Sequence, residues 1–339
     1  MKKIPHFIGI DISSDDFTVS IFINPELPIK TRGPFLNSSE GFEAFQQWLR
    51  SHHVNARNSI LCLEATGVYG EQLCYWLKAQ GFIVAIEPPL KVKRSFDTKG
   101  HKTDTIDSRQ IAEYAFRFHD ELKSWQPRHE IIEQIKVLLS TREQFVHQKT
   151  ADMNSLNALR RKVVQTPLAN QFYQTNIQNL SQQIKVIEKE IQKLIDQDPD
   201  FKNTVSLLRT IPGVAMLLAA NLLVVTHGFT QELYYKRLAA YIGICPYKHE
   251  SGKYVYKKPR SARYGPARLR KLLRLAARSL KTHKKPYQCY FLQKSAQGKE
   301  SAVILNNISN KLLKIMCAII NNQKPYQENY KSMNPLILS

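Results

Sequence analysis

The sequence predicts an α/β fold at the N-terminus, a helical middle segment and a mainly α-helical C-terminal part. Strand and helix patterns alternate up to residue 125, a heptad pattern runs through residues 177–194, and helical patterns continue beyond residue 201. These observations divide the chain into residues 1–125, 126–200 and 201–339.

The N-terminal elements follow from apolar alternation and turn residues. Residues 7–12 and 17–22 predict two strands, and the polar turn from Ser13 to Asp16 favours a β-hairpin between them. Ser39 is expected to cap a helix that ends near His53, and residues 59–64 predict a third strand. A helix over 70–80, a strand over 82–87 and a break at Pro88 follow. The order strand, strand, helix, strand, helix, strand predicts a sheet with an antiparallel edge.

The remaining elements are helical. Residues 105–119 carry apolar side chains on one face and predict the helix that closes the first domain. A polar, glutamine-rich stretch then contains a seam at heptad spacing, formed by Ile177, Leu180, Ile184, Ile187, Ile191 and Leu194. Pro167 predicts a turn between two long helices, so the seam either closes a hairpin within the chain or pairs two protomers. Residues 214–225 predict a core helix, and a last helix is expected over 301–321.

Positive charge is concentrated at the C-terminal end. The chain has 49 Lys and Arg residues against 28 Asp and Glu, a net charge of +21. Residues 1–125 hold 15 basic and 15 acidic side chains, residues 126–200 hold 10 and 9, and residues 201–339 hold 24 and 4. Residues 236–285 alone carry 16 Lys or Arg and one acid, Glu250, interleaved with tyrosines. Such a segment favours binding to nucleic acid, because cations neutralise phosphates and aromatic rings stack on bases.

Four carboxylates of the N-terminal domain form a candidate metal site. Asp11 and Glu64 each end a predicted strand, and Asp104 and Asp107 share one face at the start of a predicted helix. An RNase H-like fold would bring these positions to one site. Clustered carboxylates repel one another unless cations are bound, and hard oxygen ligands suit Mg²⁺ or Mn²⁺. Two such ions stabilise the attacking and leaving oxygens of phosphoryl transfer.

Candidate serines lie in the basic segment. Ser251 precedes a glycine and is flanked by cations, which would stabilise charge that develops on a phosphate under attack by the hydroxyl. Ser261 is similarly placed and is the second candidate, and His249 is a candidate base. Taken alone, Ser251 fits a turn serine beside glycine better than a nucleophile. The candidate nucleic-acid contacts are Lys248, Lys253, Lys257, Lys258, Arg260, Arg263, Arg268, Arg270, Lys271 and Arg274.

Several motifs resemble the DEDD transposases of the one-ten family of insertion sequences, which include the Piv/MooV DNA invertases. They are residues 9–13 (GIDIS), 64–69 (EATGVY), 102–107 (KTDTID), 211–213 (IPG), 240–246 (AYIGICP), 251–252 (SG) and 269–273 (LRKLL). The resemblance runs in order over nearly the whole chain. The family often has Lys-x-Gly-Asn where residues 263–266 read RYGP, and alanine is common at the position of Ser108.

The resemblance implies a RuvC-like N-terminal domain, a coiled-coil linker and a helical domain that carries a nucleophilic serine. By match, the metal-binding acids are Asp11, Glu64, Asp104 and Asp107, and the serine is Ser251. The implied activity is site-specific DNA recombination or transposition through a covalent phosphoserine link to DNA. DNA, a structured guide RNA and a homodimer or homotetramer are the implied partners.

Three other functions fit parts of the sequence. A metal-dependent nuclease of the Holliday-junction type would use the acids without the serine, and a nucleic-acid scaffold would use only the charge. A sugar-kinase-like ATPase would share the first strand, although Gly67 and Gly70 are a weak phosphate-loop signal. The five scattered cysteines predict a reducing cytoplasm. The lack of an 18-residue apolar run and the strand pattern at the N-terminus predict no membrane segment and no signal peptide. With the family resemblance, the expected location is the bacterial cytoplasm, in association with the nucleoid.

Overall fold

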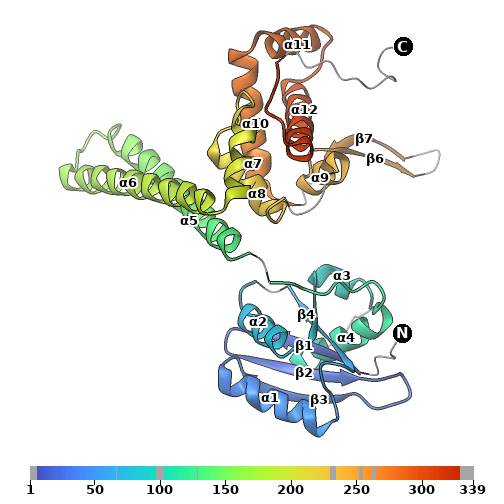
Figure 1. The fold of residues 1–339 in the computed structure, drawn as a ribbon. Coiled ribbons are helices and arrows are strands. Elements are labelled where there is room, and N and C mark those ends of the chain that lie inside the picture. The colour runs from blue at the N-terminus through green and yellow to red at the C-terminus, as the bar shows by residue number, and fades with distance from the viewer. Residues whose placement is uncertain are drawn as a thin grey trace, which may run out of the picture. The chain divides into compact units, whose positions relative to one another are not determined.

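The computed structural model describes residues 6–65, 67–96, 103–127, 129–229, 234–251, 255–261 and 265–328. The side chains of residues 247–251 and 255–260 lie outside this description. The chain divides into two compact units, Met1–Pro127 and Arg128–Ser339, here called the N-terminal and C-terminal units (Figure 1). The predicted division into three parts stays a prediction.

The N-terminal unit contains a mixed five-stranded sheet in the order β3-β2-β1-β4-β5. Its strands are β1 (His6–Ile12), β2 (Asp16–Phe22), β3 (Lys30–Leu36), β4 (Ser59–Glu64) and β5 (Ile83–Glu87). The pairs β1–β2 and β2–β3 are antiparallel, whereas β1–β4 and β4–β5 are parallel. The predicted β1–β2 hairpin and the antiparallel edge are confirmed, and the topology is consistent with an RNase H-like domain.

Helices cover both faces of this sheet. The helices α1 (Ser39–Ser51) and α2 (Glu71–Ala79) share one core with alternate residues of the strands, including Ile8 and Ile10 of β1. On the other face, α4 (Asp104–Arg117) packs on Phe7 of β1 and Cys62 of β4. A short helix, α3 (Pro89–Lys93), follows β5. Strand alternation thus separates the two faces, and residues 9 and 11 of β1 belong to the α4 face.

The predicted strand order was wrong in one respect, because it omitted β3. Residues 30–36 contain Gly33 and Pro34, which interrupt the apolar alternation, and only Phe35 is buried. Proline is tolerated there because β3 is an edge strand, so one side of its backbone has no neighbour to bond. Gly33 fits because a Cβ at this position would lie 2.6 Å from the Thr18 hydroxyl oxygen. Tertiary packing on β2, not local pattern, makes this strand.

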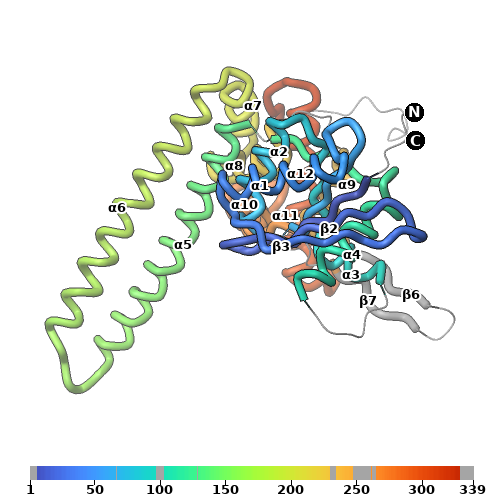
Figure 2. The backbone as a smooth tube through the Cα atoms, turned by 90° about the horizontal axis from the view of Figure 1, so that it is seen from below, coloured from blue at the N-terminus to red at the C-terminus, as the bar shows by residue number. Residues whose placement is uncertain are grey.

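In the C-terminal unit, α5 (Glu130–Leu159) and α6 (Pro167–Gln197) form a long helical hairpin. Figure 2 shows the two helices side by side. Five of the six seam residues are buried, and Ile177 is half-buried. Of the two alternatives for the seam, closure within the chain is therefore the one the structure has. A supercoiled geometry for this pair stays a prediction.

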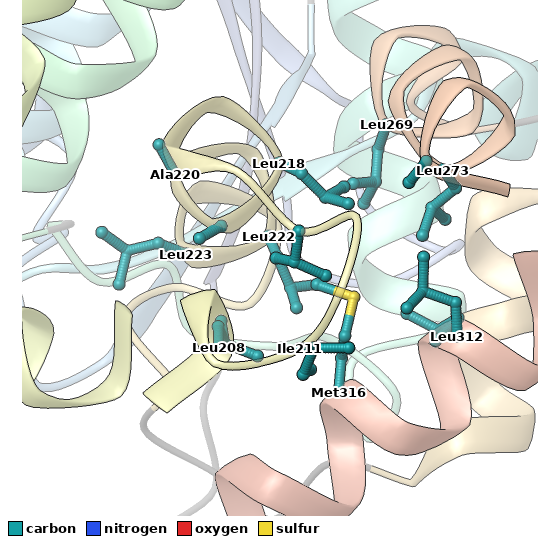
Figure 3. Packing of buried hydrophobic residues seen from close by; sticks show 14 of the residues in the cluster. Leu208, Ile211, Leu218, Ala220, Leu222, Leu223, Leu269, Leu273, Leu312 and Met316 are labelled. Carbon is teal, nitrogen blue, oxygen red and sulfur yellow. The ribbon is translucent and has the colours of Figure 1, made fainter. Parts of the chain in front are cut away.

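Among its described residues, the C-terminal unit has six further helices: α7 (Pro199–Arg209), α8 (Met216–Val225), α9 (Tyr235–Ile242), α10 (Ala267–His283), α11 (Lys285–Ala296) and α12 (Ser301–Asn322). Leu218, Leu222, Leu273, Leu312 and Met316 meet in their shared core (Figure 3). The predicted core helix over 214–225 and the last helix are confirmed as α8 and α12. The sequence did not predict β6 (Pro246–Ser251) and β7 (Val255–Ser261), which form an antiparallel hairpin.

The helix α12 is long and apolar enough to cross a membrane by length and composition, with a mean hydropathy of 1.4. More than half of that stretch, 56%, is buried inside the C-terminal unit, where Ile308, Leu312 and Met316 contact the core. This burial is that of a core helix.

Candidate functional site

Asp11 and Glu64 lie at the carboxyl ends of neighbouring parallel strands. In the β1–β4 ladder, Ile10 is opposite Leu63, so Asp11 and Glu64 are the next residues along the two strands. Both belong to the α4 face, because side chains two residues apart point to the same side of a sheet. Gly9 precedes Asp11 by two residues, and a Cβ added there would meet the backbone of α4. Cys62 precedes Glu64 by two residues and shares a buried core with α4. The two acids therefore share one edge and one face.

The first turn of α4 lies at the same end of β1. The rings of Phe7 and Phe116 are 5.4 Å apart, and an added Cβ at Gly9 would meet the backbone of Ser108 and Ala112. The strand β1 and the helix α4 therefore run in opposite directions. The N-terminal end of α4 thus lies near the C-terminal end of β1, where Asp11 is located. The hydroxyls of Ser108 and Ser20 are 2.9 Å apart and fix this register across β2.

Asp104 and Asp107 occupy that first turn. The side chain of Thr103 caps the helix by accepting a hydrogen bond from the backbone N–H of Ile106. Both acids also favour the positive end of the helix dipole. Asp104 is exposed, whereas Asp107, Asp11 and Glu64 are each half-buried. Two strand ends and one helix start thus bring the four predicted acids to one region of the N-terminal unit.

The donor chemistry of this region fits a divalent cation. Carboxylate oxygens are the ligands that Mg²⁺ and Mn²⁺ prefer. Among the residues that the structure describes, no three His, Cys, Asp or Glu side chains are close enough together to form a ready-made metal site. The fold therefore places the four acidic residues at one end of the sheet. Which of them bind a metal ion stays a prediction.

A fifth carboxylate, Glu87, was missed by the sequence analysis. It ends β5 opposite Glu64 and is only 7% exposed. Its Oε2 atom accepts a hydrogen bond from the Tyr114 hydroxyl at 3.4 Å and lies 3.1 Å from the Lys91 ammonium. Burial, together with the charges of Glu87 and Glu64, raises the pKa of the Cys62 thiol, which lies on the same face. A signal was present, since Glu87 ends its strand as Glu64 does.

Glu87, Lys91 and Tyr114 connect the end of β5 to α4. Hydrogen bonds to Tyr114 and Glu87 raise the pKa of Lys91 above its ordinary value, so these contacts favour the charged ammonium. The Lys91 ammonium also lies 5.7 Å from the centre of the Tyr114 ring. Because α4 carries Asp104 and Asp107, these contacts help to set the distance between the helix acids and the strand acids.

The substitution Tyr114→Phe is expected to lower the free energy of unfolding by about 1 kcal/mol, because it removes one hydrogen bond to a buried carboxylate. Chemical denaturation measures the change. Tyr69→Phe is the control, since Tyr69 is 48% exposed. Equal stability of Tyr114→Phe and the parent protein would contradict a role for this bond in holding α4.

Ser251 and Ser261 lie at opposite ends of the β6–β7 hairpin. Ser251 is the last residue of β6 and pairs with Val255, whereas Ser261 pairs with Pro246 at the hairpin base. Figure 1 shows the hairpin projecting from the helices of the C-terminal unit. His249 is opposite Lys257 in the same ladder. The turn between the strands lies outside the described residues, and so do the side chains of Ser251 and His249.

Three of the predicted nucleic-acid contacts have partners within the chain. Arg270 donates from one terminal guanidinium nitrogen to the carbonyl of Ile242 at 2.8 Å. The Lys271 ammonium lies 2.9 Å from Glu143 of α5, and Arg268 lies 3.9 Å from the same carboxylate. Burial alone would raise the pKa of Glu143, but Lys271 and Arg268 more than offset this, so its pKa is lowered.

These contacts tie α10 to α5 and to the end of α9, a role that sequence periodicity does not show. As nucleic-acid contacts, Arg268, Arg270 and Lys271 stay predictions, as does the exposed Arg274. Lys253 and Arg263 lie outside the described residues. The side chains of the other four candidates, Lys248, Lys257, Lys258 and Arg260, also lie outside them.

Comparison with known proteins gives the same result at both ends of the chain. Residues 8–163 match the family model of the DEDD transposase domain of the IS110 type, which spans all four predicted acids. Residues 205–291 match a second model, described as transposase of the IS116/IS110/IS902 family, which spans Ser251 and the basic segment. Pilin gene-inverting proteins of Moraxella lacunata and Moraxella bovis are each 29% identical over 325 residues, covering 95% of this chain and 98% of theirs.

Proposed function

Because this chain belongs to the IS110 family of transposases, we propose that it recombines DNA at specific sites with a two-part active site. The RuvC-like N-terminal unit supplies Asp11, Glu64, Asp104 and Asp107 for divalent metal ions, and the C-terminal unit supplies Ser251 as the nucleophile. One observation supports the assignment of the four acids: the ends of the parallel strands β1 and β4 and the start of α4 lie on one face of the sheet.

The chemistry exchanges one phosphate ester for another. The Ser251 oxygen attacks a DNA phosphorus, the bond from phosphorus to one sugar oxygen breaks, and the serine proton ends on that oxygen. Attack on the phosphoserine by the hydroxyl of a different DNA strand reverses the step and restores the serine. Mg²⁺ or Mn²⁺, when bound, stabilises charge on the phosphate oxygens. No external energy source is needed, because each step conserves the number of phosphodiester bonds.

The position of Ser251 supports its assignment over Ser261. A nucleophile must reach a phosphate on the surface of DNA, and Ser251 lies at the projecting end of the hairpin. Ser261 lies at the hairpin base beside Pro246 and is half-buried. The surrounding segment is strongly basic, which favours a phosphate backbone in contact with it.

The proposal includes further partners and a mode of reaction. Residues 201–339 carry 24 basic and 4 acidic side chains, which supports binding to DNA and to a structured guide RNA. Exchange between two DNA sites requires two cleaved duplexes, which favours a homodimer or homotetramer. The names of the Moraxella relatives support inversion of a DNA segment as one outcome of the reaction.

Covalent capture tests the serine. The full-length protein is expressed in cells that carry DNA spanning the gene and its flanks, and lysates are denatured to recover DNA that is covalently attached to protein. Ser251→Ala is expected to reduce this adduct at least about a hundredfold, because no other group replaces the attacking oxygen. Ser261→Ala is the matched control, lies on the same hairpin, and is expected to form the adduct normally.

Two results would redirect the proposal. Normal recombination by Ser251→Ala would show that the serine is not the nucleophile. Cleaved DNA without any adduct, in the parent protein as well, would indicate attack by water, as in a metal-dependent junction nuclease.

A further inference from the structure

A hollow of about 1010 Å³ lies in the C-terminal unit, away from the β6–β7 hairpin in sequence and fold. Its walls are the first half of α11 with the preceding Lys284, the part of α12 from residue 307 onward, residues 324–328, and Pro212. Three aromatic rings and three cations stand out among the lining residues, namely Tyr287, Tyr290, Tyr326, Lys284, Lys311 and Lys324. We call this hollow the tyrosine pocket. Its volume is at the upper end of the size range of small-molecule sites, about 300–1,000 Å³.

The rings of the tyrosine pocket are held by the fold. Tyr287 and Tyr290 are three residues apart on α11, hence on one face of the helix, and both pack partly buried against the core. Tyr326 faces them from the segment after α12, where its backbone N–H donates to the Thr210 hydroxyl at 2.9 Å. Burial and the neighbouring Tyr326 raise the pKa of Tyr287, so its hydroxyl stays protonated. Rings held in this way can stack on a flat ligand without losing much conformational freedom.

The charges of the pocket favour an anion. Lys311 is exposed at the wall with its ammonium 5.7 Å from the centre of the Tyr287 ring. Lys324 is also exposed, and Lys284 pairs with Glu328 at 3.1 Å. Among the lining residues that the structure describes, Glu328 is the one acid. Three ammonium groups against one carboxylate leave a positive excess beside the rings.

Amide groups add hydrogen-bonding capacity. Asn307 and Asn322 also line the pocket, and the Asn307 amide nitrogen lies 3.5 Å from the Tyr290 hydroxyl. An asparagine side chain both donates and accepts, as the edges of nucleobases do. The wall therefore combines rings, cations and amides, which are the groups that bind single-stranded nucleic acid.

We propose that the tyrosine pocket binds an unpaired nucleotide of DNA or RNA, with its base against the tyrosines and its phosphate beside Lys311 and Lys324. A paired base cannot enter a concave site, because its faces are covered by its neighbours in the stack. A purely apolar ligand would make no use of the cations and amides in the pocket wall. The pocket contains none of the acids or serines assigned to catalysis, so it can be tested separately from the proposed recombination chemistry.

Stacking is tested by fluorescence of 2-aminopurine at the centre of single-stranded 12-nucleotide DNA and RNA oligomers bound to the full-length protein. The rest of the basic surface also binds oligomers, so quenching of this base, and not affinity alone, reports on the pocket. Tyr290→Leu keeps apolar packing but removes the ring, and it is expected to abolish most of the quenching and to weaken binding roughly tenfold. Tyr290→Phe is the matched control and is expected to quench as the parent protein does.

The phosphate contact is tested by salt dependence. Lys311→Gln is expected to lower the slope of log Kd against log salt concentration by about 0.7, the value for one phosphate contact to a single strand. Lys314→Gln is the control, because Lys314 is exposed on the same helix but does not line the pocket. Equal slopes for the two variants would overturn the phosphate assignment.

The remaining outcomes either support or overturn the proposal. Quenching only with the RNA oligomer assigns the pocket to RNA, quenching only with DNA assigns it to the recombining strands, and both results support it. If Tyr290→Leu quenches like the parent while its unfolding midpoint is unchanged, the pocket binds no base and the proposal is wrong. Asp11→Asn is expected to quench normally, so failure of the recombination proposal would leave this result intact.

Discussion

Gly9→Ala is expected to lower the free energy of unfolding of the N-terminal unit by about 3 kcal/mol or more. The added Cβ would lie 2.2 Å from the backbone N of Ala112, 2.2 Å from the backbone O of Ser108 and 2.8 Å from the Ala112 Cα. These are backbone atoms of a helix, so no side chain can rotate out of the way. The helix α4 must move away from β1, which also separates Asp104 and Asp107 from Asp11.

Tryptophan fluorescence during chemical denaturation measures this change. All three tryptophans, Trp48, Trp76 and Trp125, belong to the N-terminal unit, so the signal reports on that unit. Gly70→Ala is the control, because a Cβ there would make ordinary contacts of 3.6 Å and 3.7 Å with side chains. An unfolding curve of Gly9→Ala that matches that of Gly70→Ala would show that α4 does not approach β1 so closely.

Asp11→Asn is expected to reduce recombination at least about a hundredfold while leaving the fold and DNA binding intact. Asparagine has the same shape as aspartate but no charge, so it would hold a divalent cation much more weakly. Asp11 lies in the central strand of the sheet, where it pairs with Thr18 of β2 and directly follows the last β1–β4 pair, Ile10 with Leu63. Its position is therefore rigid, and a neighbouring acid cannot readily replace it.

Metal binding gives a second measurement that does not depend on activity. Mg²⁺ or Mn²⁺ is expected to raise the Tm of the parent protein, because a ligand that binds only the folded state stabilises it, and to raise that of Asp11→Asn much less. Asp15→Asn is the control, since Asp15 is exposed in the turn after β1. Full recombination by Asp11→Asn, or an equal metal-induced shift in all three proteins, would contradict the assignment.

Most of the N-terminal fold is visible in the sequence because its strands are short, apolar and separated by clear turns. The β1–β2 hairpin follows from alternation and the polar turn between its strands, and the strand that ends at Glu64 follows from a short apolar run. The strand β3 does not, since Gly33 and Pro34 interrupt its pattern and its pairing with β2 decides its structure. Glu87 was missed for a different reason, as the sequence does not show that Tyr114 and Lys91 surround it.

The C-terminal unit was harder to predict because its basic residues both form a strand pair and make ion pairs within the chain. Residues 246–261 contain many lysines and arginines, which hides the period of two that a strand pair needs. Likewise, nothing in the sequence near Lys271 shows that its partner is Glu143, 128 residues earlier in the chain. Charge predicts what class of molecule the segment binds, whereas the fold decides which cations pair internally.

The close contact between β1 and α4 can form only late in the synthesis of the N-terminal unit. Gly9 is among the first residues of the N-terminal unit to leave the ribosome, whereas Ser108 follows 99 residues later, which is about 5–20 s at ordinary rates of translation. Until then a nascent chain carries Asp11 and Glu64 but lacks the helix that brings the other two acids. A partly made N-terminal unit therefore lacks Asp104 and Asp107, and the four acids come to one region only when the whole unit can fold.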